Sequence, residues 1–172
     1  MRITLPMTTV RGGARRAGLA LLALSLLSAP TVPGAAAQEA RALSSVHRLQ
    51  DLHFGTLVPG TENAVSVQDV SRRAEVVLHG RGAVQLLIVL PSEMVSPEGA
   101  RLPLRFGPAD AAFVAGTAAQ PQRFDPRAGA VVTLPPAGEA RLLLGGTAVV
   151  PFDQPAGQYS ADLLVMVVNT RS

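Results

Sequence analysis

Residues 139–169 read EARLLLGGTAVVPFDQPAGQYSADLLVMVVN and contain two β-rich segments, 139–151 and 158–169, on either side of a Pro-Ala-Gly turn. Apolar and β-branched residues dominate both segments, and glycine and proline interrupt them at short intervals. Such spacing leaves little room for a helix. The stretch therefore predicts short strands joined by tight turns.

The same pattern extends back along the chain. Between further glycine and proline turns lie six more β-rich segments, at residues 52–58, 64–70, 74–79, 84–90, 101–106 and 131–134. Eight short strands with little helix predict an all-β fold, an antiparallel sandwich of immunoglobulin-like kind over residues 51–172. Residues 108–129 show no clear period, so we expect a long surface loop there. The polar, alanine-rich residues 38–50 are expected to form a flexible lead-in.

The N-terminal residues 1–37 have the three parts of an export signal. An arginine-rich leader precedes the apolar run AGLALLALSLLSA at residues 17–29, and the small residues Ala35-Ala36-Ala37 follow at the position that a signal peptidase recognises. A membrane anchor needs about twenty apolar residues, and this run is shorter. We therefore expect a cleaved signal peptide, no transmembrane anchor after cleavage, and a location in the periplasm, on the outer surface or outside the cell.

Charge and cysteine content exclude several classes of function. The 172-residue chain has fifteen arginines, no lysine and a formal net charge of +3. Four of the arginines precede residue 17, so removal of the leader leaves eleven against twelve acidic residues and a formal charge of −1. The basic balance is therefore no argument for nucleic-acid binding. The absence of cysteine excludes disulfides, thiol catalysis and cysteine-based zinc sites.

The sequence contains no catalytic constellation. His47, His53 and His79 lack the spacing of metal ligands, the acidic residues occur singly, and no G-x-S-x-G motif is present. We therefore predict that the protein is not an enzyme and has no cofactor and no metal site. A periplasmic module that binds a ligand or a carbohydrate is the alternative, although aromatic residues suited to sugar binding are scarce.

Three motifs resemble those of a known family. LHFGTLVPG at residues 52–60, LGGTAVVP at 144–151 and QPAGQY at 154–159 occur in that order. They resemble the motifs of the exported bacterial domain of unknown function 4402 family, which is distantly similar to spore coat protein U and the archaic chaperone–usher pilins. The residues that carry the resemblance are Leu52, Phe54, Gly55, Pro59, Gly145, Gly146, Gly157 and Tyr159.

The resemblance implies an immunoglobulin-like sandwich in the cell envelope, with a structural or adhesive role. In its most specific form the protein would be a pilin-like subunit joined by strand addition, in which an extended segment pairs with an open sheet edge. Its partners would be a periplasmic chaperone or like subunits. The donor segment of such a subunit would lie in residues 38–50.

The closing segment, residues 158–169, is unusual because both of its faces are apolar. Strict alternation would make one face polar, but Leu164, Met166 and Val168 occupy that face. Two explanations remain open. Either the loop at residues 108–129 folds over this face, or a partner chain covers it, since a contiguous exposed apolar patch usually marks an interaction surface.

We predict that signal peptidase cleaves after Ala37, because small residues follow the apolar run there. N-terminal sequencing of the protein isolated from producing cells is expected to begin at Gln38. A mature chain that still carries residues 17–29 would contradict the prediction.

Overall fold

The computed structural model describes residues 2–3, 43–116, 120–135 and 139–170. Every regular element among these residues is a strand, so the predicted all-β class is confirmed. Apart from residues 2–3, the predicted signal peptide lies outside the described residues.

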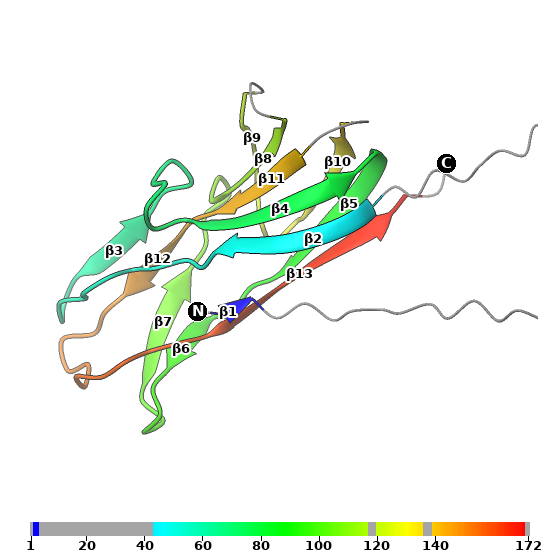
Figure 1. Ribbon diagram of the computed structural model, residues 1–172. Coiled ribbons are helices and arrows are strands. Elements are labelled where there is room, and N and C mark those ends of the chain that lie inside the picture. Colours follow the sequence, from blue (N-terminus) through cyan, green and yellow to red (C-terminus); the bar gives the residue numbers. More distant parts are fainter. Residues whose placement is uncertain (1, 4–42, 117–119, 136–138, 171–172) are drawn as a thin grey trace, which may run out of the picture. The chain divides into compact units, whose positions relative to one another are not determined.

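The described strands follow one another as shown in Figure 1. They are β1 (Arg2–Ile3), β2 (Leu43–Gln50), β3 (Glu62–Val65), β4 (Ala74–Gly80), β5 (Gly82–Val89), β6 (Glu93–Val95), β7 (Arg101–Arg105), β8 (Ala111–Ala115), β9 (Gln122–Phe124), β10 (Ala130–Leu134), β11 (Glu139–Leu144), β12 (Gly146–Val149) and β13 (Asp162–Asn169).

The strands pair into three sheets that form a sandwich-like arrangement. Their orders are β2-β4-β11-β8-β9, β1-β13-β5-β10 and β3-β12-β7-β6. All pairings are antiparallel except that of β1 with β13. Only Gly145 separates β11 from β12, so one nearly continuous stretch of chain lies at the centre of two sheets.

One hydrophobic core lies between the sheets. Strand β5 has one buried face, because Val84, Leu86 and Ile88 are buried while Gln85 and Val89 are exposed. The inward side chains of β4, β10, β11 and β13 join the same cluster. Burial of each large aliphatic side chain contributes about 1.5 to 3 kcal/mol, so this cluster supplies most of the driving force for folding.

The five-stranded sheet is also buried on its outer face. Glu75, Val77 and Leu143 point away from the core, yet each is less than a tenth exposed. Val67 packs against Leu143 and Ala112 to form a second, smaller cluster on that face. Two-sided burial therefore occurs on β4 and β11, whereas the sequence predicts it for the closing segment.

Two expectations about the N-terminal part are wrong. Residues 43–50, assigned to a flexible lead-in, form β2, which pairs with β4 from Leu43 opposite Gly80 to Gln50 opposite Glu75. Two register irregularities in this pairing explain why no regular alternation is visible in the sequence. Residues 52–58, predicted as a strand, form none in the structure.

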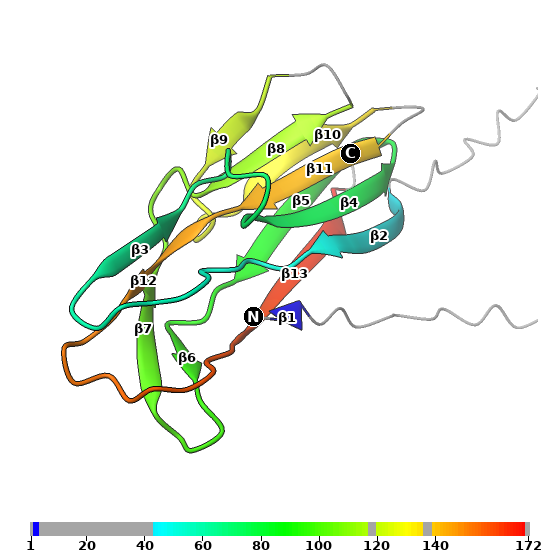
Figure 2. The same cartoon turned by 60° about the vertical axis from the view of Figure 1, so that its left-hand side comes forward.

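The loop predicted at residues 108–129 contains two strands. Its alanine-rich segment Ala111–Ala115 forms β8, which pairs with β11, and β9 pairs with β8 in turn (Figure 2). Ala111, Ala112 and Phe113 are buried, although alanine gives no strand signal in a sequence. The short strand β6 was likewise not predicted.

Gly145, between β11 and β12, and Gly146, the first residue of β12, lie where neighbouring atoms leave no room for a side chain. A Cβ atom at Gly145 would lie 2.2 Å from the carbonyl oxygen of Val65, and one at Gly146 would lie 2.8 Å from the ring of Phe106. The obstacle at Gly145 is backbone, so it cannot move without shifting β3. The pair of glycines is therefore a packing requirement of the crossing between two sheets.

We predict that Gly145→Ala destabilises the protein by about 2 to 3 kcal/mol, because overpacking against backbone cannot relax locally. Gly157→Ala is the matched control, since a Cβ there meets its nearest atom only at 3.8 Å. Denaturant unfolding measures both free energies. Equal stability of the two variants would contradict the prediction.

Candidate functional site

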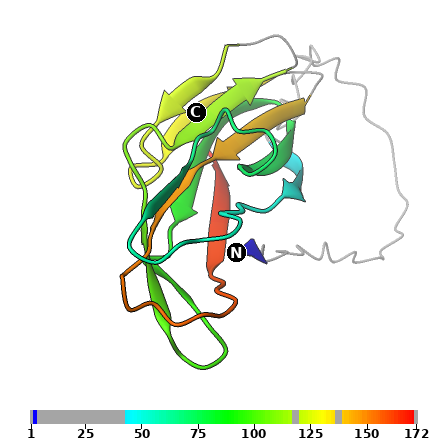
Figure 3. The ribbon, with the colours of Figure 1, turned by 90° about the vertical axis from the view of Figure 1, so that its left-hand side faces the viewer.

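A cleft of about 840 Å³ lies at one end of the sandwich-like fold. Its walls come from residues 52–59 after β2, from β6 and β7, and from residues 150–159 between β12 and β13. Figure 3 shows the β6–β7 hairpin and the β12–β13 loop at the same end of the fold. The cleft therefore gathers segments from the beginning, the middle and the end of the described chain.

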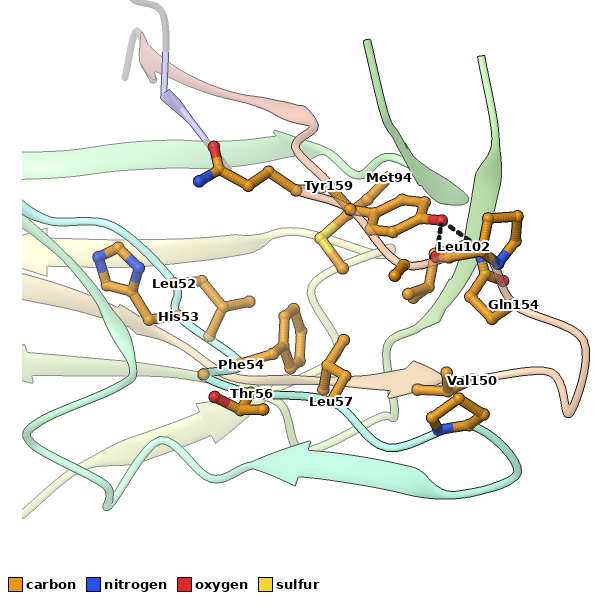
Figure 4. A pocket seen from close by; sticks show the side chains of 16 residues that line it. Leu52, His53, Phe54, Thr56, Leu57, Met94, Leu102, Val150, Gln154 and Tyr159 are labelled. Atoms are coloured by element: carbon orange, nitrogen blue, oxygen red, sulfur yellow. Dashed lines mark hydrogen bonds between the residues drawn. The ribbon is translucent and has the colours of Figure 1, made fainter. Parts of the chain in front are cut away.

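The floor of the cleft is apolar. Its members Leu52, Phe54, Met94 and Leu102 are each at most 6% exposed, and Figure 4 shows them from close by. Residues 52–54 are not in a strand, but the backbone amide of His53 donates a hydrogen bond of 2.8 Å to the carbonyl of Arg72. This bond holds the segment in an extended course, so that Leu52 and Phe54 are buried while His53 between them is exposed.

Tyr159 organises the rim of the cleft. Its hydroxyl accepts a hydrogen bond of 2.7 Å from Nε2 of Gln154 and donates one of 2.6 Å to the carbonyl of Pro155. Just beyond it, the backbones of Val95 and Ser160 exchange hydrogen bonds of 2.8 and 3.1 Å. The first pair of bonds fixes the turn at residues 154–159, and the second ties that turn to β6.

Backbone hydrogen bonds also join the two loops at the cleft mouth. The amide of Gly60 donates to the carbonyl of Val150 at 2.9 Å, and the amide of Val150 donates to Thr61 at the same distance. Gly60 has a φ of +79°, and a Cβ there would lie 2.4 Å from the ring of Phe152. The positive φ favours glycine at this position, and the ring of Phe152, which is 89% exposed, lies directly beside it.

The lining of the cleft consists of apolar side chains, the amides of Gln154 and Gln158, the hydroxyls of Thr56 and Tyr159, and the imidazole of His53. Among the described residues that line it there is no Asp, Glu or Arg, so the cleft offers no carboxylate for acid–base work. The described part of the chain also contains no group of three metal-ligating residues. The rings of His47 and His79 do meet, with centroids 5.9 Å apart, but they lie outside this cleft.

Six of the eight residues that carry the family resemblance line the cleft. They are Leu52, Phe54, Gly55, Pro59, Gly157 and Tyr159. Gly145 and Gly146 lie elsewhere, at the junction of β11 and β12. Sequence reasoning missed Met94 and Leu102, which the β6–β7 hairpin brings into the same cleft as Tyr159. Met94 was missed because β6 has only three residues, too few for a visible alternation.

The candidate partner face on β13 is partly exposed. Leu164 is half-buried, while Met166 and Val168 are 37% and 47% exposed. Leu87 and Val89 of β5 stand opposite Met166 and Leu164 and extend this apolar surface. The described residues of 108–129 do not support the explanation that this loop folds over the face, because β8 and β9 extend the five-stranded sheet instead.

Comparisons with known proteins add no assignment. A scan against models of protein families finds no match, and a search of curated proteins finds no relative. Among the described residues, no helix has the length and apolar character needed to cross a bilayer.

We predict that replacing Leu164 and Met166 together by Thr changes the free energy of unfolding by about 1 kcal/mol or less, because Met166 is exposed and Leu164 is only half-buried. The same change is expected to weaken any self-association through this face, because it removes apolar area from an interface. Denaturant unfolding and light scattering measure the two effects. A loss of several kcal/mol would show that these side chains are covered after all.

Proposed function

We propose that the protein is an exported, non-enzymatic protein of the cell envelope with an immunoglobulin-like sandwich fold, joined to a partner chain by strand addition. In this proposal it is a structural or adhesive, pilin-like subunit, and its partner is a periplasmic chaperone or a like subunit. The observation that carries the proposal is the open edge of β13.

The edge of β13 is paired on one side and nearly free on the other. Along one side, β13 pairs with β5 from Leu164 opposite Val89 to Asn169 opposite Val84. On the other side, β1 pairs only with Asp162 and Leu163, so residues 164–169 have no strand partner there among the described residues. An unpaired edge of this length is a template for another strand.

The pairing of β1 itself supports an edge that accepts an added strand. Arg2 and Ile3 lie opposite Asp162 and Leu163 in parallel orientation, far from them in sequence. Cleavage after Ala37, as predicted above, removes β1 with the leader. The whole of β13 then becomes available to a partner once the protein has been exported.

The cleft lies next to the beginning of this edge and adds side-chain recognition. Residues 154–159 line the cleft and lead directly into β13. In strand addition, main-chain hydrogen bonds supply affinity while alternate side chains of the added strand fill pockets. An uncharged cleft with an apolar floor suits an aliphatic or aromatic side chain of such a strand.

The donor strand comes from another polypeptide in this proposal. Residues 43–50, which belong to the candidate donor segment, already form β2 and pair with β4 in their own sheet. Using them as a donor would break that pairing. This favours a chaperone, or a segment of a like subunit other than β2, as the occupant of the β13 edge.

A binding module for an uncharged ligand is the second candidate function. The cleft volume of about 840 Å³ lies within the range of small-molecule sites, and the lining combines an apolar floor with amide and hydroxyl groups. Tyr159 is the tyrosine at its rim, and its hydroxyl is already engaged by Gln154 and Pro155. That engagement favours strand addition over sugar recognition.

Photo-crosslinking in producing cells tests the proposal. A photoreactive amino acid replaces Met166 in one variant and Val168 in a second, both on the exposed face of β13. An added strand would place successive same-face residues beside these two positions. We expect both variants to crosslink to one polypeptide segment, at attachment points two residues apart.

The matched control carries the same photoreactive residue at Val131, which is exposed on β10 at the opposite edge of the sheet. It is expected to give no crosslink to that segment. Absence of crosslinks from positions 166 and 168, or attachment points without a common register, would contradict strand addition at β13.

A further inference from the structure

A second cavity, of about 270 Å³, lies on the outer face of the five-stranded sheet. Its lining comes from the loop before β4, from β11 and from the chain around β9. The lining residues are Val67, Gln68, Arg73, Gln120, Pro121, Arg123 and Leu143. None of them belongs to the cleft described above, so this cavity is a separate site.

The strand register explains why these residues meet. Arg123 of β9 stands opposite Ala112 of β8, Ala112 stands opposite Leu143 of β11, and Leu143 stands opposite Glu75 of β4. Residues directly opposite one another on neighbouring strands share a face. The row therefore presents an apolar centre, with a guanidinium at one end and a carboxylate at the other.

Arg73 brings a second guanidinium to this face from the residue before β4. Its Nη2 donates to Oε2 of Glu75 at 2.9 Å, and its Nη1 donates to the carbonyl of Val67 at 3.0 Å. Its Nε is buried and has no hydrogen-bond partner among the described residues. A buried donor without an acceptor is rare in native proteins and calls for an explanation.

The face carries a surplus of positive charge. Glu75, only 5% exposed, is shared between Arg73 and Arg141, and Arg141 also pairs with Glu139. Arg123 forms no ion pair within the described chain. Three guanidiniums thus face two carboxylates, and the uncompensated one lines the cavity.

The loop that carries Arg73 is held in place by its own hydrogen bonds. Oδ2 of Asp69 accepts from Nε of Arg72 at 2.7 Å, and the amide of Arg73 donates to the carbonyl of Asp69 at 2.9 Å. Hydrogen bonds from Ser71 and Arg72 hold the pKa of the Asp69 carboxyl below its usual value. The carboxylate of Asp69 and its backbone carbonyl thus hold the loop that positions Arg73.

We propose that this cavity binds the carboxylate group of a small organic acid. The carboxylate would lie between Arg73 and Arg123, whose planar guanidinium groups match its geometry. Its charge would compensate the guanidinium of Arg73, whose buried Nε lacks an acceptor, while the amides of Gln68 and Gln120 offer further donors. The carbon chain of the acid would contact Val67, Leu143 and Pro121, a surface that inorganic phosphate does not use.

Titration of the purified protein with butyrate, followed by nitrogen-15 NMR, tests this site. Arginine Nε–H groups give their own resonances, so the side chains of Arg73 and Arg123 are observed directly. At constant ionic strength, we expect butyrate to shift both resonances in a saturable way, with inorganic phosphate binding more weakly. Butyramide, which has the same shape without the charge, is expected to shift neither.

The variant Arg123→Gln is expected to bind butyrate about tenfold more weakly, because it removes the uncompensated charge and one charge-assisted hydrogen bond. The structure gives the Arg123 side chain no hydrogen bond or ion pair within the described residues, so this variant is expected to fold as the parent does. Arg127→Gln is the matched control, since Arg127 is an exposed arginine outside the cavity. It is expected to bind butyrate as tightly as the parent.

Three results would overturn the proposal. One is the absence of a saturable shift at Arg73 Nε–H with butyrate up to about 100 mM, beyond which binding has no functional meaning. Another is an equal loss of butyrate affinity in the Arg123→Gln and Arg127→Gln variants, which would show that overall charge alone causes the effect. Phosphate binding as tight as that of butyrate would overturn the assignment to an organic acid.

Discussion

The close backbone approach at Gly145 is the constraint on which the rest of the structure depends. Here the chain passes from β11, at the centre of the five-stranded sheet, to β12, at the centre of a second sheet. The carbonyl of Val65 lies so near that no side chain fits between them. The crossing sets where β3 and β7 lie, and these strands in turn determine where the loops at residues 52–61 and 150–159 meet to form the cleft.

The sequence predicts the strands that are rich in apolar and β-branched residues between glycine and proline turns, and it misses those that depend on a neighbour. Apolar runs of this kind indicate β5 and β13. Strand β2 exists through its pairing with β4, and β8 exists because alanines fit a tightly packed position. Neither cause leaves a periodic signal. For the cleft, the sequence motifs identify residues such as Phe54 and Tyr159. Only the fold shows that these residues line one cleft together with Met94.

The two candidate sites differ in their electrostatics, and the difference follows from which face of a sheet each one uses. The cleft opens from the apolar interior at the end of the sheets, so aliphatic and aromatic groups form its floor. The smaller cavity lies over an outer face, where Arg73 and Glu75 sit close together under partial burial. Buried charges need partners, and this network keeps one carboxylate between two guanidiniums. The lining of the cleft is therefore suited to an uncharged group, and the lining of the smaller cavity is suited to an anion.

The place of Tyr159 has a spectroscopic consequence. It is the only tyrosine of the chain, and the sequence contains no tryptophan. Nearly all intrinsic ultraviolet fluorescence of the protein therefore originates from a single ring at the rim of the cleft. The hydroxyl of this ring is hydrogen-bonded to Gln154 and Pro155. Any occupant that covers this ring or competes for its hydrogen bonds alters that emission. The chain thus carries a built-in optical reporter of its own cleft, without a label or a substitution.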